Sequence, residues 1–315
     1  MIDHDCYPHL MDLIVHHAPS SSLLALRPAS RTFRDVVDAI FTNHIVVSRT
    51  NGCVKITSPL GRIPTLMRYH IDPDVTLTAY GTPYTETLVT AALGKLGNTH
   101  TITFATVLPE DVYTQFQHLA SVQVVRYVSA ARAARPPIMG AKTNVFFCVP
   151  RLELVRVSIR RALTRDMEKL VLNVPFDTNG WVRQPPISAG MYPPYRPTAA
   201  QEVVIILTRE RHLVYNSDAD GYLWPLCYWE PAVSLLCHFQ IQSKWHRYTV
   251  VGAEDLPLRV PPNGPEVEES MEEHMRSKLR CDPAVSDELV HFATRDEYRL
   301  RVGDRQFELE TAYPM

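Results

Sequence analysis

The stretch that decides the N-terminal fold runs from Tyr7 to Phe41 and reads YPHLMDLIVHHAPSSSLLALRPASRTFRDVVDAIF. Three short apolar segments follow one another in it, with Pro or Ser at each join. Proline pre-sets the backbone angle of a first helical turn, and serine caps a helix N-terminus. The stretch therefore predicts three consecutive short helices.

The apolar residues of the three segments recur at helical spacing, which gives each expected helix an apolar face. They are Leu10, Leu13 and Ile14 in the first, Leu23, Leu24 and Leu26 in the second, and Phe33, Val36, Val37 and Ile40 in the third. A unit of fewer than about forty residues cannot fill a stable core alone. We therefore expect it to bury part of its apolar surface against something else.

In this stretch the sequence resembles the F-box proteins, whose motif has a Pro-centred start, an acidic-then-aliphatic helix, a Leu-rich helix and a basic-x-aromatic third helix. The residues that match, in order, are Pro8, Asp12-Leu13-Ile14, Leu23-Leu24-Ala25-Leu26 and Arg31-Thr32-Phe33-Arg34-Asp35. Tyr7 stands where Leu usually precedes the proline, Phe33 replaces Trp, and Pro28 interrupts a run that is often continuous. Because Pro28 disfavours helix at Arg27, we expect the second helix to end there and the third to begin at Pro28.

The resemblance implies a non-catalytic substrate-receptor subunit of a ubiquitin ligase of the Skp–cullin–F-box type. Such a subunit holds a target at high effective concentration near an enzyme borne by another subunit. The implied partners are a Skp-family adaptor, through it a cullin, and an unknown protein substrate. The residues implied to form the adaptor surface, or the small core behind it, are Pro8, Leu10, Leu13, Ile14, Leu23, Leu24 and Phe33.

The alternative is a protein-interaction scaffold without a ligase role, in which the three helices pack back on the following domain as a cap. Exposure distinguishes the two hypotheses. A partner is indicated if Leu13, Leu23 and Leu24 face solvent, and a cap if residues beyond Val47 cover all of them.

After Phe41 the pattern changes to short aliphatic strands, such as His44–Ser48, Thr76–Tyr80 and Thr101–Phe104, separated by polar and helical segments. Several of them fit the leucine-rich-repeat pattern L-x-x-L-x-L, in which aliphatic residues point into a stacked parallel sheet. They are Leu119/Val122/Val124, Leu152/Val155/Val157, Met167/Leu170/Leu172 and Ala200/Val203/Ile205. Their spacing is irregular, so the pattern predicts a degenerate leucine-rich-repeat-like α/β array. A non-repeating α/β domain with aliphatic strands explains the same pattern.

The expected organisation has three parts. An F-box-like helical unit spans 1–43, a leucine-rich-repeat-like α/β domain spans 44–256, and a proline-rich linker with a charged helical segment spans 257–315. This layout resembles F-box proteins of the fungal type. Within it, segments 126–147 and 175–197 read as long connections that either bind a partner or are poorly ordered. We expect the last strand at 244–251, a charged helix at 266–279, a short helix near 294–299 and an extended end near 307–309.

Composition gives no global attraction to nucleic acid or to an anionic membrane, because 32 basic residues face 34 acidic ones and the formal net charge is -2. The acidic N-terminus is not followed by an apolar run, which argues against a secretory signal. No stretch approaches the roughly 18 apolar residues of a membrane helix. Six scattered cysteines without a C-x-x-C pair indicate a reducing compartment, the cytoplasm or the nucleus.

The sequence contains no catalytic or phosphate-binding motif, so we expect no enzyme and no cofactor. Two groups, His4, Cys6 and His9 and also Cys227, Cys237 and His238, lack the paired spacing of zinc ligands, and we expect no metal. The run of arginines from 151 to 165 lacks interleaved aromatic residues and contains acidic ones, which fits a solvated edge or a groove for an acidic protein better than nucleic acid.

Overall fold

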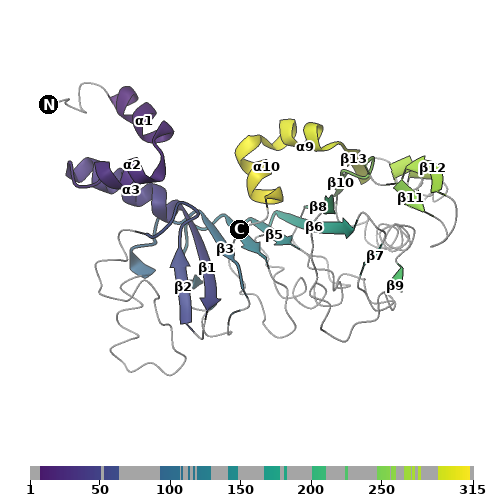
Figure 1. Cartoon of the computed structure of the whole chain (residues 1–315), viewed down its shortest axis with the longest axis horizontal. Coiled ribbons are helices and arrows are strands. Elements are labelled where there is room, and N and C mark those ends of the chain that lie inside the picture. The colour runs from purple at the N-terminus through teal and green to yellow at the C-terminus, as the bar shows by residue number, and fades with distance from the viewer. Residues whose placement is uncertain are drawn as a thin grey trace. The chain divides into compact units, whose positions relative to one another are not determined.

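The computed structural model has mixed α/β structure and divides into two compact units, residues 1–122 and 123–315 (Figure 1). It describes residues 8–50, 53–63, 93–106, 108, 113, 116–117, 119–128, 141–147, 167–177, 181–182, 201–210, 224–225, 247–255, 257–259, 266–270, 272–273, 276–277 and 290–312. Within these ranges no helix is both long enough and apolar enough to cross a membrane.

Three helices open the first unit: α1 (Pro8–His17), α2 (Ser20–Leu26) and α3 (Arg31–Asn43). They occupy the stretch in which the sequence predicts three helices. The expectation that the third begins at Pro28 is wrong, because Ser30 is the N-cap of α3. Its hydroxyl accepts a hydrogen bond from the Phe33 N–H at 3.1 Å, which satisfies one of the free N–H groups of the first turn.

The first unit continues into three strands, β1 (His44–Thr50), β2 (Cys53–Thr57) and β3 (Thr101–Phe104), in the order β2-β1-β3. β1 pairs antiparallel with β2 and parallel with β3. Two hydrogen bonds attach the end of α3 to this sheet. The Thr99 hydroxyl donates to the carbonyl of Thr42 at 2.9 Å, and the His100 N–H donates to that of Asn43 at 2.9 Å.

The second unit is built on parallel strands that lie side by side in chain order. They are β4 (Val124–Tyr127), β5 (Thr143–Phe147), β6 (Lys169–Asp177), β8 (Glu202–Glu210), β10 (Arg247–Val251) and β13 (Val290–Ala293). Two small antiparallel pairs form separate two-stranded sheets. They are β7 (Trp181–Val182) with β9 (Trp224–Pro225), and β11 (Pro257–Arg259) with β12 (Glu266–Ser270). Helices α9 (Arg295–Val302) and α10 (Asp304–Thr311) end the described chain.

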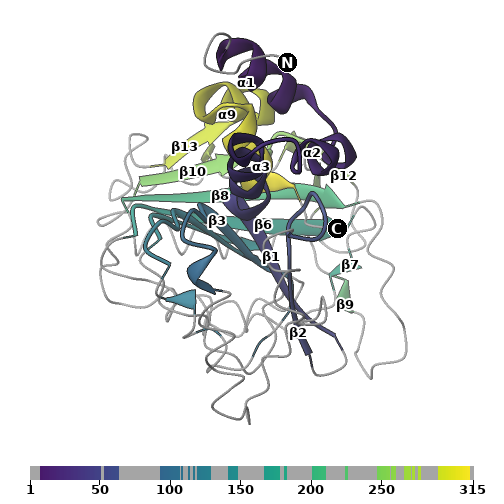
Figure 2. The same ribbon diagram turned by 90° about the vertical axis from the view of Figure 1, so that its left-hand side faces the viewer.

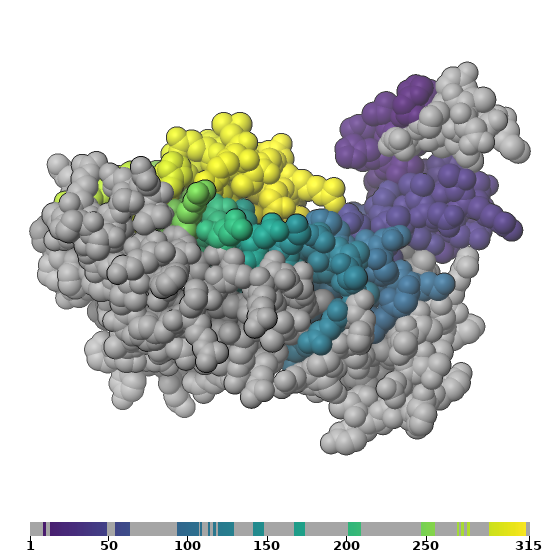
Figure 3. Space-filling model, turned by 180° about the vertical axis from the view of Figure 1, so that it is seen from behind, coloured from purple at the N-terminus to yellow at the C-terminus, as the bar shows by residue number. Residues whose placement is uncertain are grey.

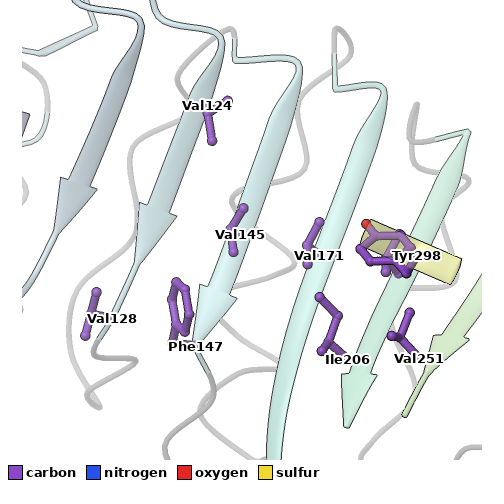
Figure 4. Packing of buried hydrophobic residues seen from close by; sticks show 9 residues of the cluster. Val124, Val128, Val145, Phe147, Val171, Ile206, Val251 and Tyr298 are labelled. Atoms are coloured by element: carbon purple, nitrogen blue, oxygen red, sulfur yellow. The ribbon is translucent and has the colours of Figure 1, made fainter. Parts of the chain in front are cut away.

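The core of the second unit lies between one face of the parallel sheet and α9. Neighbouring strands contribute aliphatic side chains to it, and Tyr298 of α9 is fully buried among them (Figure 4). The buried members are Val124, Val128, Val145, Phe147, Val171, Val204, Ile206, Val251 and Tyr298. This face therefore follows the two-residue period of the strands.

Strand β5 lies inside the segment 126–147 that the sequence pattern assigns to a long connection, so that part of the assignment is wrong. A buried asparagine hides the strand in the sequence, because Asn144 interrupts the aliphatic alternation. The structure accommodates it with a contact 3.1 Å long from its Nδ2 to the sulfur of Met167. The neighbouring segment 175–197 contains the end of β6 and all of β7.

The C-terminal expectations also need correction. Residues 266–270, expected as the start of a charged helix, form β12, because pairing with β11 overrides the helix propensity of the glutamates. Residues 272–273 and 276–277 are helical. Residues 307–309, expected as extended, belong to α10, and β10 is not the last strand. The expected strand at 76–80 and the repeat at 152–157 lie outside the described residues.

A buried carboxylate holds α10 on the sheet. The Glu310 side chain is fully buried, and its Oε1 accepts hydrogen bonds from Lys169 Nζ at 2.6 Å and Gln306 Nε2 at 2.7 Å. The Tyr298 hydroxyl donates to Oε2. Burial, and then the nearby Glu310 charge, raise the pKa of Tyr298, so the phenol keeps the proton that it donates. At the end of α10, Asn173 Nδ2 donates to the Glu310 carbonyl at 2.7 Å.

We expect Glu310→Ala to lower the free energy of unfolding of the second unit by about 3 kcal/mol, because it leaves the Lys169 ammonium largely buried without its counter-charge. Chemical denaturation, monitored by hydrogen exchange of α9 and α10, measures this change in the free energy of unfolding. Arg305→Ala, an exposed position on the same helix, is the matched control and should change stability by less than about 0.5 kcal/mol. Equal effects of the two substitutions would contradict the role given to Glu310.

Candidate functional site on the N-terminal helices

The outer face of α1 exposes three aliphatic side chains at positions i, i+3 and i+4. Leu10 is 46% exposed, Leu13 54% and Ile14 43%. Among the described side chains of this ten-residue helix, Val15 is the buried one. A helix of about ten residues is marginal on its own in water, and aliphatic residues at this spacing are what a helix presents to an apolar groove of a partner.

In α2 two adjacent leucines have opposite environments. Leu23 is buried, with 3% of its surface exposed, whereas Leu24 is 43% exposed. Successive residues of a helix point about 100° apart, so the rotation of α2 about its axis decides which leucine is covered. Leu23 is also the only buried residue of α2.

A small core behind these leucines joins the three helices. It contains Val15 from α1, Leu23 from α2, and Val37 and Phe41 from α3, with Ala18, Phe33 and Ile40 packed against it. Every described member lies between residues 15 and 41. Leu23 is thus covered by its own helical unit, and Leu13 and Leu24 are exposed. A cap would require residues beyond Val47 to cover these leucines. Among the described residues, none beyond Val47 belongs to this core.

Figures 2 and 3 show where the three helices lie in the first unit. α3 leads from the strands of the first unit to α1 and α2, and atoms of the three helices, in purple, lie at the surface seen in Figure 3. Val36 of α3 is 37% exposed and is a further exposed aliphatic side chain of the three helices. We call Leu10, Leu13, Ile14, Leu24 and Val36 the exposed aliphatic set.

An ion pair connects α2 to α3. Arg27 Nε donates to Asp38 Oδ1 at 2.7 Å, and Arg27 Nη2 donates to Asp38 Oδ2 at 3.0 Å. Both side chains are largely shielded, with 17% and 16% of their surfaces exposed. The hydrogen bonds to Asp38 raise the pKa of Arg27. Two parallel bonds between planar groups fix direction as well as distance.

The structure separates the sequence-predicted adaptor residues into three groups. Leu10, Leu13, Ile14 and Leu24 are exposed, whereas Leu23 is buried and Phe33 is half-buried against the small core. Pro8 opens α1, and its side chain lies outside the described part of the chain. Sequence reasoning missed two features, the exposure of Val36 and the Arg27–Asp38 pair. Helical spacing places Val36 on the apolar face together with Val37, so nothing in the sequence signalled its exposure.

Other sequence candidates contribute nothing to this site. The arginines at 151–165 and the Cys/His group at 227–238 lie outside the described residues, as do His4 and Cys6. Within the described ranges, no group of three or more His, Cys, Asp or Glu residues is arranged to hold a metal ion. No protein-family model, curated protein or solved structure matches this chain.

The adjacent leucines of α2 give a matched test of the small core. We expect Leu23→Ala to lower the free energy of opening of α2 and α3 by about 2 to 3 kcal/mol, because it leaves a cavity in a core of few residues. Leu24→Ala should change it by less than about 0.5 kcal/mol, because its side chain is already exposed. Native-state hydrogen exchange of peptides from 20–43 measures both. The same loss of protection in the two variants would contradict the opposite environments described above.

Proposed function

We propose that this chain is a substrate-receptor subunit of a Skp–cullin–F-box type ubiquitin ligase. In this proposal α1 to α3 bind a Skp-family adaptor, the second unit holds a protein substrate, and the chain does no chemistry itself. The proposal places the protein in the cytoplasm or the nucleus, where such ligases work.

One observation carries the proposal. Leu13 and Leu24 match aliphatic positions of the F-box motif, and both are exposed over a core that is complete without them. Exposed aliphatic residues that recur on one helix at turn spacing favour an interaction site over a random surface. A helical cap of its own domain would have buried these side chains.

Burial of these exposed side chains would contribute substantially to the free energy of adaptor binding. Burying the exposed part of a leucine or isoleucine contributes on the order of 1 kcal/mol. Four such side chains, those of Leu10, Leu13, Ile14 and Leu24, supply about 4 kcal/mol, roughly half of what a micromolar complex requires. Their burial alone would therefore not suffice for such a complex, and the adaptor has to make further contacts.

The second unit supports the other half of the proposal. Its parallel strands lie beside one another in chain order, which is the order that stacked repeats produce. We accordingly propose an irregular leucine-rich-repeat-like array. The proposal assigns substrate binding to the connections between strands, because a rigid sheet presents its loops at its ends.

Co-purification with a purified Skp-family adaptor tests the proposal. We expect the intact chain to form a stable complex at micromolar concentration, and Leu13→Asp/Leu24→Asp to weaken it at least about a hundredfold. The substitution removes two apolar contacts and introduces two carboxylates that the interface would have to bury.

Leu60→Asp/Leu300→Asp is the matched control, because Leu60 is 43% exposed and Leu300 85% exposed, both outside the three helices. It should bind the adaptor like the wild-type chain. Circular dichroism checks that both double variants keep their helices. No complex with the wild-type chain, or equal binding by the two double variants, would leave the alternative hypothesis of an interaction scaffold without a ligase role.

A further inference from the structure

Helix α2 has few contacts that fix its orientation. It has seven residues, of which Leu23 is buried and Ser20 and Leu26 are half-buried. With a single buried side chain, α2 has little packing that resists a turn about its axis. A turn of about 100° would exchange the environments of Leu23 and Leu24.

The Arg27–Asp38 ion pair provides a second contact that fixes the orientation of α2. α2 ends at Leu26, and Arg27 follows as its C-cap, with the Arg27 N–H bonded to the Leu23 carbonyl at 3.1 Å. Pro28 comes next and cannot continue the helix. The Arg27 guanidinium therefore extends from the end of α2. It donates two hydrogen bonds to Asp38 of α3, at 2.7 Å and 3.0 Å.

We infer that the Arg27–Asp38 ion pair is a positioning device of the adaptor-binding face: together with Leu23 it fixes the rotation of α2, so that Leu24 faces the partner. The inference rests on the proposed function for its partner. The rotation of α2 itself does not depend on that function.

No residue of α2 carries a positive charge that could replace Arg27 in the ion pair. Arg34 lies one helical turn before Asp38 and can approach the same carboxylate, but both residues belong to α3. An ion pair between Arg34 and Asp38 would therefore leave α2 without a bond to α3. Arg27 is therefore the side chain whose loss should release the rotation of α2.

Thiol labelling measures the rotation without any partner. Leu23→Cys and Leu24→Cys are made separately in the full chain, and peptide mass spectrometry distinguishes the new thiols from the native cysteines. We expect Cys at position 24 to react at least about ten times faster than Cys at position 23 in the wild-type background. In the Arg27→Met background we expect this ratio to fall toward one, while hydrogen exchange of α3 stays unchanged.

Adaptor binding gives the second readout. We expect Arg27→Met to weaken the complex about tenfold. Arg27→Lys should keep the charge and lose the two-bond geometry, giving a smaller effect than Arg27→Met. The exchanged pair Arg27→Asp/Asp38→Arg should recover part of both the labelling ratio and the affinity.

An unchanged labelling ratio in Arg27→Met would overturn the inference, as would unchanged adaptor affinity. Loss of α3 protection in that variant would also overturn it, since the pair would then be a general support of the unit. If the wild-type chain does not bind the adaptor, the proposed function fails and the labelling ratio alone decides the positioning role.

Discussion

A parallel sheet has to be covered on both faces, and the second unit is organised around that requirement. All four residues of β4 are buried, as are the last four of β5 and of β10. On one face the cover is α9, which inserts Tyr298 among the aliphatic residues of the strands. The two helices that end the described chain are thus part of the core.

The polar groups under these helices determine where α10 lies. A carboxylate cannot be buried without partners, and Glu310 receives donors from the sheet, from α9 and from its own helix. A buried ion pair adds little net stability over an apolar contact, because both charges lose water. Its contribution here is geometric, because Glu310 joins α10 to Lys169 of β6 and to Tyr298 of α9.

The first unit has the opposite problem. Its three helices are too short to bury all their apolar residues, so the small core takes Val15, Leu23, Val37 and Phe41 and leaves the exposed aliphatic set outside. Such a unit lowers its free energy by binding a partner, which is the physical basis of the proposed adaptor site. Because α2 buries only Leu23, we propose that the largely shielded Arg27–Asp38 ion pair determines which of its leucines the proposed adaptor contacts.

Local signals predicted well where the chain interacts with near neighbours. The helices of 8–43 follow from helical spacing and from proline and serine at the joins, and β1 and β3 follow from short aliphatic runs. Prediction failed where a distant contact overrides local preference. β12 consists largely of glutamates and is a strand because it pairs with β11, and β5 carries a buried asparagine that contacts Met167.

The sequence alone determined that residues 8–43 contain three amphipathic helices and that an α/β region with aliphatic strands follows them. It also placed Leu23 and Leu24 together on the second helix, without indicating which of them is buried. Only the tertiary structure decided that, as well as the pairing of Arg27 with Asp38 and the burial of Glu310. The reason is that periodicity assigns residues to a face within one segment. The orientation of that face depends on contacts with other segments, which the sequence pattern does not contain.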